Sequence, residues 1–175
     1  DVYKRQVSNE LYLNQGDLKF KKVTEQAKLD SSHFWSSGVA AVDINSDGLM
    51  DIYVASSMQK GNRENRLYIN QGNNNEGIPI FKEEAKNYGI DDSSNTMGVA
   101  FIDFDRDGDL DLYVLNNEQN ATLPTNYRKK ILDGSALSND KFYKNNGNGT
   151  FSDITLQAGI VYEGFGLSVT PVDIN

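Results

Sequence analysis

The sequence predicts an all-β protein made of tandem four-stranded antiparallel units, like the blades of a β-propeller. Three observations predict it. A nine-residue acidic template occurs twice, short β-branched and aromatic runs flank each copy, and a second motif with an Asn-x-Gly turn alternates with the template. Tandem units of four short strands are typical of propellers. We therefore expect a fragment of a β-propeller, with an acidic loop in the first hairpin of each blade.

The acidic template reads DINSDGLMD at 43–51 and DFDRDGDLD at 103–111, with oxygen-bearing side chains at positions 1, 3, 5 and 9 and glycine at 6. Ca²⁺ takes about six to eight oxygen ligands, and glycine allows the sharp turn that brings alternate residues together. A merely solvated acidic loop needs neither the glycine nor the repeated spacing. We predict two calcium loops, with these side-chain ligands: Asp43, Asn45, Asp47 and Asp51, then Asp103, Asp105, Asp107 and Asp111.

Strand-like runs, not helices, flank each acidic loop. GVAAV precedes the first loop and IYVA follows it, while GVAFI precedes the second and LYVL follows it. Short apolar runs bounded by turn residues are typical of strands buried on both faces. An EF-hand would have flanking helices and a glutamate at position 12, where this chain has Val54 and Val114. Each loop is therefore predicted to close the first hairpin of a blade.

A second motif occurs three times and supplies the other hairpin of each unit. It reads LYLNQG at 11–16, LYINQG at 67–72 and FYKNNG at 142–147. Asn and Gly tolerate positive φ, so Asn-x-Gly indicates a tight turn. A phenylalanine then opens a polar, strand-like segment, at 20–27, 81–88 and 151–158. The tyrosines that recur in these runs predict packing between blades.

The two motifs alternate with a regular spacing. Asp103 follows Asp43 by 60 residues, and Asp173 follows Asp103 by 70 as the opening of a third acidic loop that includes Asn175. A β-sandwich has no reason to repeat its loops. We expect one partial propeller domain over 1–175, flanked by neighbouring blades of a longer chain. Its expected parts are half a blade at 1–36, complete blades at 37–95 and 96–163 with an insertion at 116–140, and the first strand of another blade at 164–175.

Taken together, these motifs make nearly the whole chain resemble FG-GAP or VCBS-type repeats, which are similar to the calcium-binding blades of the integrin α-subunit propeller. The suggested subgroup is that of cartilage acidic protein and bacterial proteins with an ASPIC/UnbV region. The resemblance implies that a backbone carbonyl at loop position 7 also binds calcium, here that of Leu49 and of Asp109. One departure is Ser168, where the other blades have Gly38 and Gly98.

Composition limits the partners and the location. The net charge is −8, which argues against nucleic acid because phosphate binding needs clustered Lys and Arg. No apolar run approaches the roughly 18 residues of a membrane span. Without cysteine, disulfides and thiolate metal sites are excluded. Moderate-affinity calcium loops fill where calcium is about millimolar, so we expect an extracellular or cell-surface protein, either secreted or, in a bacterium, periplasmic or anchored in the outer membrane.

The sequence favours a binding module over an enzyme. There is one histidine, and no Gly-x-Ser-x-Gly elbow or P-loop accompanies it. We expect a protein or glycan ligand. The candidate contacts are Trp35, for which packing is the competing interpretation, and Tyr127 and Arg128 of the insertion, since binding usually sits on loops. The alternative is part of a propeller-based polysaccharide lyase or glycoside hydrolase, whose paired carboxylates meet only in the fold.

Overall fold

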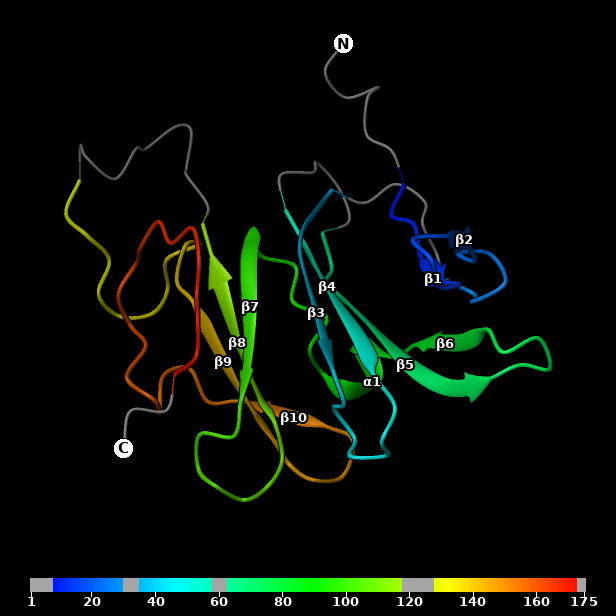
Figure 1. Ribbon diagram of the computed structural model, residues 1–175. Helices are drawn as coiled ribbons and strands as arrows, with labels where there is room; N and C mark the ends of the chain where they lie inside the picture. Colours follow the sequence, from blue (N-terminus) through cyan, green and yellow to red (C-terminus); the bar gives the residue numbers. More distant parts are fainter. Residues whose placement is uncertain (1–7, 30–34, 58–62, 118–127, 173–175) are drawn as a thin grey trace, which may run out of the picture.

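Nearly all regular structure in the protein is β. The computed structural model describes residues 8–29, 35–57, 63–117 and 128–172 (Figure 1). Within them, the strands form one hairpin and two four-stranded antiparallel sheets, and α1 (Ala85–Tyr88) has only four residues. The two described sheets stand beside one another and do not close into a ring (Figure 1). The prediction of an all-β fold with tandem four-stranded units is confirmed.

Each sheet is a simple meander in which consecutive strands pair. The first hairpin consists of β1 (Tyr12–Asn14) and β2 (Phe20–Lys22). The first sheet has the order β3 (Ser36–Val42), β4 (Asp51–Ser56), β5 (Arg66–Asn73) and β6 (Pro79–Glu83). The second sheet has the order β7 (Thr96–Ile102), β8 (Asp111–Asn116), β9 (Lys141–Asn145) and β10 (Phe151–Asp153).

The predicted last strand of each unit is shorter than the sequence suggests. Only its first residues pair, and the chain then makes one helical turn, which is α1 in the first sheet. The turn ends because Gly89 has φ 75° and its N–H bonds back to the carbonyl of Lys86. Gly159 (φ 73°) does the same after β10. The expectation of strands throughout 81–88 and 151–158 was therefore wrong in their second halves.

The inner strands β3 and β7 run next to one another, and glycine permits their close approach. A Cβ on Gly38 would lie 3.6 Å from the carbonyl oxygen of Met97 and 3.7 Å from the Cα of Gly98. The register of each sheet shifts at these same glycines. Small residues are needed where two backbones approach closely. This contact brings the two sheets together at one side (Figure 1).

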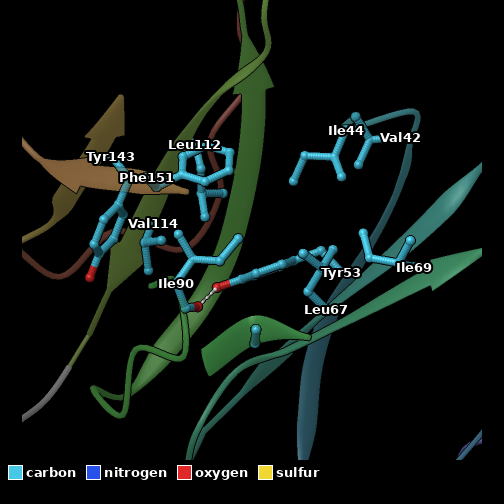
Figure 2. Packing of buried hydrophobic residues seen from close by; sticks show 11 residues of the cluster. Val42, Ile44, Tyr53, Leu67, Ile69, Ile90, Leu112, Val114, Tyr143 and Phe151 are labelled. Carbon is cyan, nitrogen blue, oxygen red and sulfur yellow. Dashed lines mark hydrogen bonds between the residues drawn. The ribbon is translucent and has the colours of Figure 1, made fainter. Parts of the chain in front are cut away.

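One hydrophobic core fills the space between the two sheets. Tyr53 of β4 is fully buried there, and its ring meets Phe101 of β7 edge to face at 5.8 Å between centroids. Its hydroxyl donates to the carbonyl of Ile90 (2.7 Å; Figure 2). Its buried members are Val42, Ile44, Tyr53, Leu67, Ile69, Ala85, Ile90, Leu112, Val114, Tyr143 and Phe151. The prediction that recurring tyrosines pack between sheets is confirmed for Tyr53.

The opposite face of the first sheet packs against the first hairpin. Alternate residues of a strand point to opposite faces, so Val54 and Tyr68 face away from the core that holds Tyr53 and Leu67. They form a second buried cluster with Val23 and Ala27 of the first unit. The first sheet is thus covered on both faces by its neighbours, which is how propeller blades bury their faces.

Residues 164–172 contain no strand, although the sequence predicts the first strand of a further blade at 164–175. The segment still runs beside the second sheet. The side-chain amide of Asn117 donates to the carbonyl of Gly166 (3.1 Å), and a Cβ on Gly98 would lie 4.0 Å from Val169. Within the described residues no strand pairs with it. A strand needs a hydrogen-bonded neighbour, which explains the difference from the prediction.

A buried aspartate on the link between the sheets joins them through polar contacts. Asp92 lies just before β7, and its carboxylate bonds to Lys141 (2.8 Å) and accepts from the Tyr143 hydroxyl (3.0 Å), both on β9. Its backbone carbonyl accepts from the N–H of Asn65, just before β5 (2.8 Å). Burial acts to raise the pKa of Asp92, but Lys141 and the N–H of Ser94 outweigh it, and the net pKa is lowered.

Asp92→Asn is expected to destabilise the fold by roughly 1–3 kcal/mol at pH 7, because it removes charge-assisted hydrogen bonds in a buried place. A lowered pKa contributes stability above the unfolded value, near 4 for aspartate, and that contribution disappears as pH falls through the folded value. The difference between variant and wild type should therefore shrink below about pH 4. Denaturant unfolding at several pH values measures this. Asp91→Asn is the control, because it makes the same charge change at the neighbouring residue. A stability difference between Asp92→Asn and wild type that stays constant with pH would contradict the role given to the Asp92 carboxylate.

Candidate metal centre

The first acidic loop, residues 43–51, is a tight turn held by its own carboxylates. Asp43 accepts hydrogen bonds from the backbone N–H groups of Asp47 (3.1 Å) and Gly48 (2.9 Å). Asp47 accepts one from the N–H of Leu49 (2.8 Å). Gly48 has φ 84°, a conformation that glycine adopts without steric cost. The side chains at positions 1 and 5 are therefore turned over the inside of the loop.

The second acidic loop, residues 103–111, repeats the same hydrogen bonds. Asp103 accepts from the N–H groups of Asp107 and Gly108, both at 3.1 Å. Asp107 accepts from the N–H of Asp109 at 3.0 Å, and Gly108 has φ 95°. Both loops lie at the same end of their sheets, the lower end in Figure 1. Two different sequences thus form one loop geometry, as their common template predicts.

The aspartate at position 9 begins the second strand of each first hairpin, and it is fully buried. Asp51 and Asp111 are both 0% exposed. One oxygen of Asp51 accepts from the N–H of Ile44 within the loop (3.1 Å), and the other accepts from the N–H of Asn70 on β5 (2.7 Å). Asp111 bonds in the same way to Phe104 (3.1 Å) and to Asn145 on β9 (2.8 Å). The acidic loop is thereby tied to the next hairpin of the sheet.

The asparagine of the second motif completes that tie. The side-chain amide of Asn70 donates to the carbonyl of Met50 (3.1 Å), and its side-chain oxygen accepts from the N–H of Gly72 (2.9 Å). Asn145 makes the corresponding bonds to Leu110 (3.3 Å) and Gly147 (3.0 Å). From the sequence, Asn-x-Gly was predicted only to form a turn. In the fold the same asparagine holds the acidic loop in place from the side.

The donor chemistry of both loops fits a hard cation. In the second loop, one carboxylate oxygen each of Asp103, Asp105 and Asp111 lie within 4.8 Å of one another. In the first loop Asn45 replaces the carboxylate at position 3, and its side chain lies beside that of Asp47. Oxygen-only sets from closely spaced residues suit Ca²⁺ or Mg²⁺, not the softer metals that prefer thiolate or imidazole.

Burial makes the charged form of the position-9 carboxylates less favourable. Burial raises the pKa of Asp51 above its ordinary value, and the backbone N–H groups of Asn70 and Ile44 offset only part of the rise. The pKa of Asp111 is raised for the same reason, with Asn145 and Phe104 as the opposing donors. Nearby acidic residues of each loop add to the rise. A cation bound among these carboxylates would favour their charged form.

The other candidate residues lie apart from the loops. Arg128 forms a two-pronged ion pair with the buried Glu163, at 3.0 Å and 2.8 Å, and Glu163 also accepts from the N–H of Ile131. Trp35 is half-buried just before β3, where its carbonyl accepts from the N–H of Ser57. Three further candidates fall outside the described residues: Tyr127, Asp173 and Asn175.

Sequence reasoning missed two contributors to this region. The asparagines at 70 and 145 were assigned to turns only, although the recurrence of asparagine at this place in every copy of the second motif could have indicated more. The other is Lys144 on β9, whose ammonium group pairs with Asp105 and lies 3.3 Å from Asp107. Aligning the repeated motifs reveals it, because lysine stands where the second copy of the motif has Ile69.

The comparison with known families agrees with this geometry. The chain matches the FG-GAP-like repeat family twice, over residues 3–54 and 46–114. The matches end at Val54 and Val114, which hold equivalent places in β4 and β8. The protein therefore belongs to the FG-GAP-like repeat family and is a β-propeller-like repeat module. A search of curated proteins finds no match. The described part of the chain has no helix long and apolar enough to cross a membrane.

Asn70→Ala is expected to destabilise the fold by about 1–2 kcal/mol, because the side-chain bond to Met50 in the acidic loop and the bond from Gly72 in its own turn are both lost. The backbone bond to Asp51 survives, so the sheet should still form. Thermal and denaturant unfolding measure the change. Gln71→Ala is the matched control, since Gln71 is exposed and makes one long bond, to its neighbour Ile69 (3.4 Å). Equal effects of the two substitutions would contradict the role of Asn70.

Proposed function

We propose that this protein is a calcium-binding β-propeller module that acts outside the cell in protein or glycan binding. The observation that carries the proposal is the repeated loop frame. Two acidic loops of different sequence share one set of backbone hydrogen bonds and present oxygen atoms at positions 1, 3, 5 and 9. A frame that is repeated to present the same acidic positions is what a bound cation would require.

Each site would use the residues of one loop. The first would take Asp43, Asn45, Asp47 and Asp51, with the carbonyl of Leu49. The second would take Asp103, Asp105, Asp107 and Asp111, with the carbonyl of Asp109. Calcium would join the tip of each loop to the buried aspartate at the start of β4 or β8. Since that aspartate also bonds to the second hairpin, the ion would stiffen the whole sheet.

An extracellular location follows from the same chemistry. Calcium loops of moderate charge are filled where the ion is about millimolar. In such a module the rigid sheets would present surface loops to a partner. The insertion between β8 and β9 supports this, because its residues 133–137 and 139, with residues 141, 153 and 155–157, line a hollow of about 720 Å³. Asp133, Lys141 and Leu156 give that hollow both charged and apolar groups, as a glycan or peptide would need.

Calcium removal is expected to lower the melting temperature. Calcium that binds only the folded loop stabilises it by about 2.7 kcal/mol per site at a hundredfold excess over Kd. For a chain of this size, that corresponds to roughly 5–10 °C per site. Adding chelator should produce the loss and millimolar Ca²⁺ should reverse it. Mg²⁺ should do so poorly, because it prefers a smaller octahedral site and keeps its waters.

Asp47→Ala and Asp107→Ala should each remove one site and leave the other. Calorimetric titration of the chelated wild type should show two calcium ions per chain, each variant one, and the double variant none. The losses of calcium-dependent stability in the two single variants should add in the double variant if the sheets act independently. A wild type that binds no calcium, or binding that survives both substitutions, would contradict the proposal.

A glycan array and a reducing-end assay separate binding from catalysis. Binding without release of new reducing ends supports the module. Turnover of a bound polysaccharide would instead favour the lyase or glycosidase alternative. Leu156→Asp places a charge in the hollow beside the insertion, where Leu156 is 64% exposed, and should weaken binding if that hollow is the contact surface. Leu18→Asp, on the first hairpin, is the control at another exposed leucine (91%) that does not line the hollow.

A further inference from the structure

Lys144 lies directly against the second acidic loop. It belongs to β9, one residue before the Asn145 that bonds to Asp111. Its ammonium group pairs with the carboxylate of Asp105 and lies 3.3 Å from that of Asp107, the residues at loop positions 3 and 5. The same group lies 6.0 Å from the centroid of the Phe104 ring. The only described cation paired with either acidic loop is thus placed on two proposed calcium ligands.

The first loop has no lysine at the corresponding place. The residue before Asn70 is Ile69, which is 5% exposed and belongs to the core between the sheets. Position 3 of that loop is Asn45, whose side-chain N–H donates to Asp47 at 2.9 Å. In each loop, then, an N–H group links positions 3 and 5. In the first loop the asparagine supplies it, and in the second the lysine supplies it because aspartate has no N–H donor.

The two differences compensate in charge. The proposed ligands of the first loop carry three carboxylates, Asp43, Asp47 and Asp51. Those of the second carry four, Asp103, Asp105, Asp107 and Asp111, so Lys144 brings that loop from −4 to −3, equal to the first. The extra aspartate at position 3 and the lysine on the neighbouring strand therefore form a matched pair.

We propose that Lys144 is an internal counter-ion of the second loop, which it holds in shape without calcium and which it leaves when calcium binds. This inference rests on the proposed calcium function. The ammonium group lies on one oxygen, Oδ2, of Asp105 and of Asp107, so calcium would have to compete with it for these oxygens, and two cations so close repel. Lys144 thus lowers the calcium affinity of the second loop, which would otherwise exceed that of the first because it has one more carboxylate.

Partial exposure makes the displacement feasible. The side chains of Lys144, Asp105 and Asp107 are 35%, 26% and 38% exposed. Ion pairs this accessible to water are weak, since solvent screens them. A lysine side chain is long and flexible, and it can extend into solvent once calcium occupies the loop. The pair is therefore suited to order the empty loop without blocking it.

Removing the charge of Lys144 is expected to affect calcium affinity and the stability of the calcium-free protein in opposite directions. Loss of the lysine charge should raise the calcium affinity of the second loop, because no cation has to leave. It should also lower the melting temperature in chelator, because the carboxylates of the empty loop then repel without compensation. A lysine that only supported the sheet would lower the melting temperature in both states and would not raise affinity.

The experiment measures calcium binding by calorimetry in the full chain with Asp47→Ala, which leaves only the second loop. Into this background go Lys144→Gln, Lys144→Arg and Lys129→Gln. The glutamine variant should bind Ca²⁺ about tenfold more tightly, since repulsion and a competing ion pair are both removed. The arginine variant keeps the charge and should stay within about threefold of Lys144. Lys129→Gln makes the same charge change on the exposed insertion and should leave affinity unchanged.

Lys144→Ile provides a second neutral variant in case glutamine disturbs the strand. It copies Ile69, the residue at the corresponding place on β5. Circular dichroism verifies the fold of each. Unchanged or weaker calcium binding in both neutral variants, or equal gains from Lys129→Gln, would overturn the role of Lys144. If the wild type and the Asp47→Ala chain bind no calcium at all, the proposed function itself fails. The titrations thus distinguish the two failures.

Discussion

The structure depends on one buried carboxylate in each sheet. Asp51 and Asp111 are excluded from water, yet both oxygens of each are hydrogen-bonded, one to the acidic loop and one to the strand of the next hairpin. A buried charge is costly unless it is bonded in this way. The loop, the hairpin that it closes and the following hairpin must therefore form together. The acidic loop is part of the sheet's internal bonding and not a surface appendage.

Buried polar groups with hydrogen bonds also join the two sheets to one another. Tyr53 fills the space between them and uses its hydroxyl on Ile90, while Asp92 joins the link between the sheets to β9. Side chains of this kind fill apolar space and also satisfy their own polar atoms, so few buried polar atoms are left without a hydrogen bond in a small core. Gly38 and Gly98 let β3 and β7 approach closely enough for this packing. A sheet of this kind has no separate core of its own, so its stability is shared with its neighbours.

The two loops show how a repeated unit can vary without losing its frame. The backbone hydrogen bonds are the same, but Asn45 in one loop is replaced by the Asp105–Lys144 pair in the other. Such exchanges change the charge that surrounds a cation while the loop geometry stays constant. The insertion varies in another way, because Arg128 is held by the buried Glu163. A residue that the sequence suggests for ligand binding thereby fastens the insertion to the segment that follows β10.

The sequence by itself determined the all-β class, the tandem units, the hairpin position of both acidic loops and the family. These follow from local signals: a glycine at position 6, alternating apolar runs and Asn-x-Gly turns, each of which acts within a few residues. Only the tertiary structure decided that Asn70 and Asn145 brace the loops, that Lys144 lies on Asp105 and that helical turns shorten the last strands. The first two features depend on residues that are distant in sequence, such as Asp111 and Asn145, which are 34 positions apart. Local patterns carry no record of such contacts, because packing against another strand, and not intrinsic propensity, selects them.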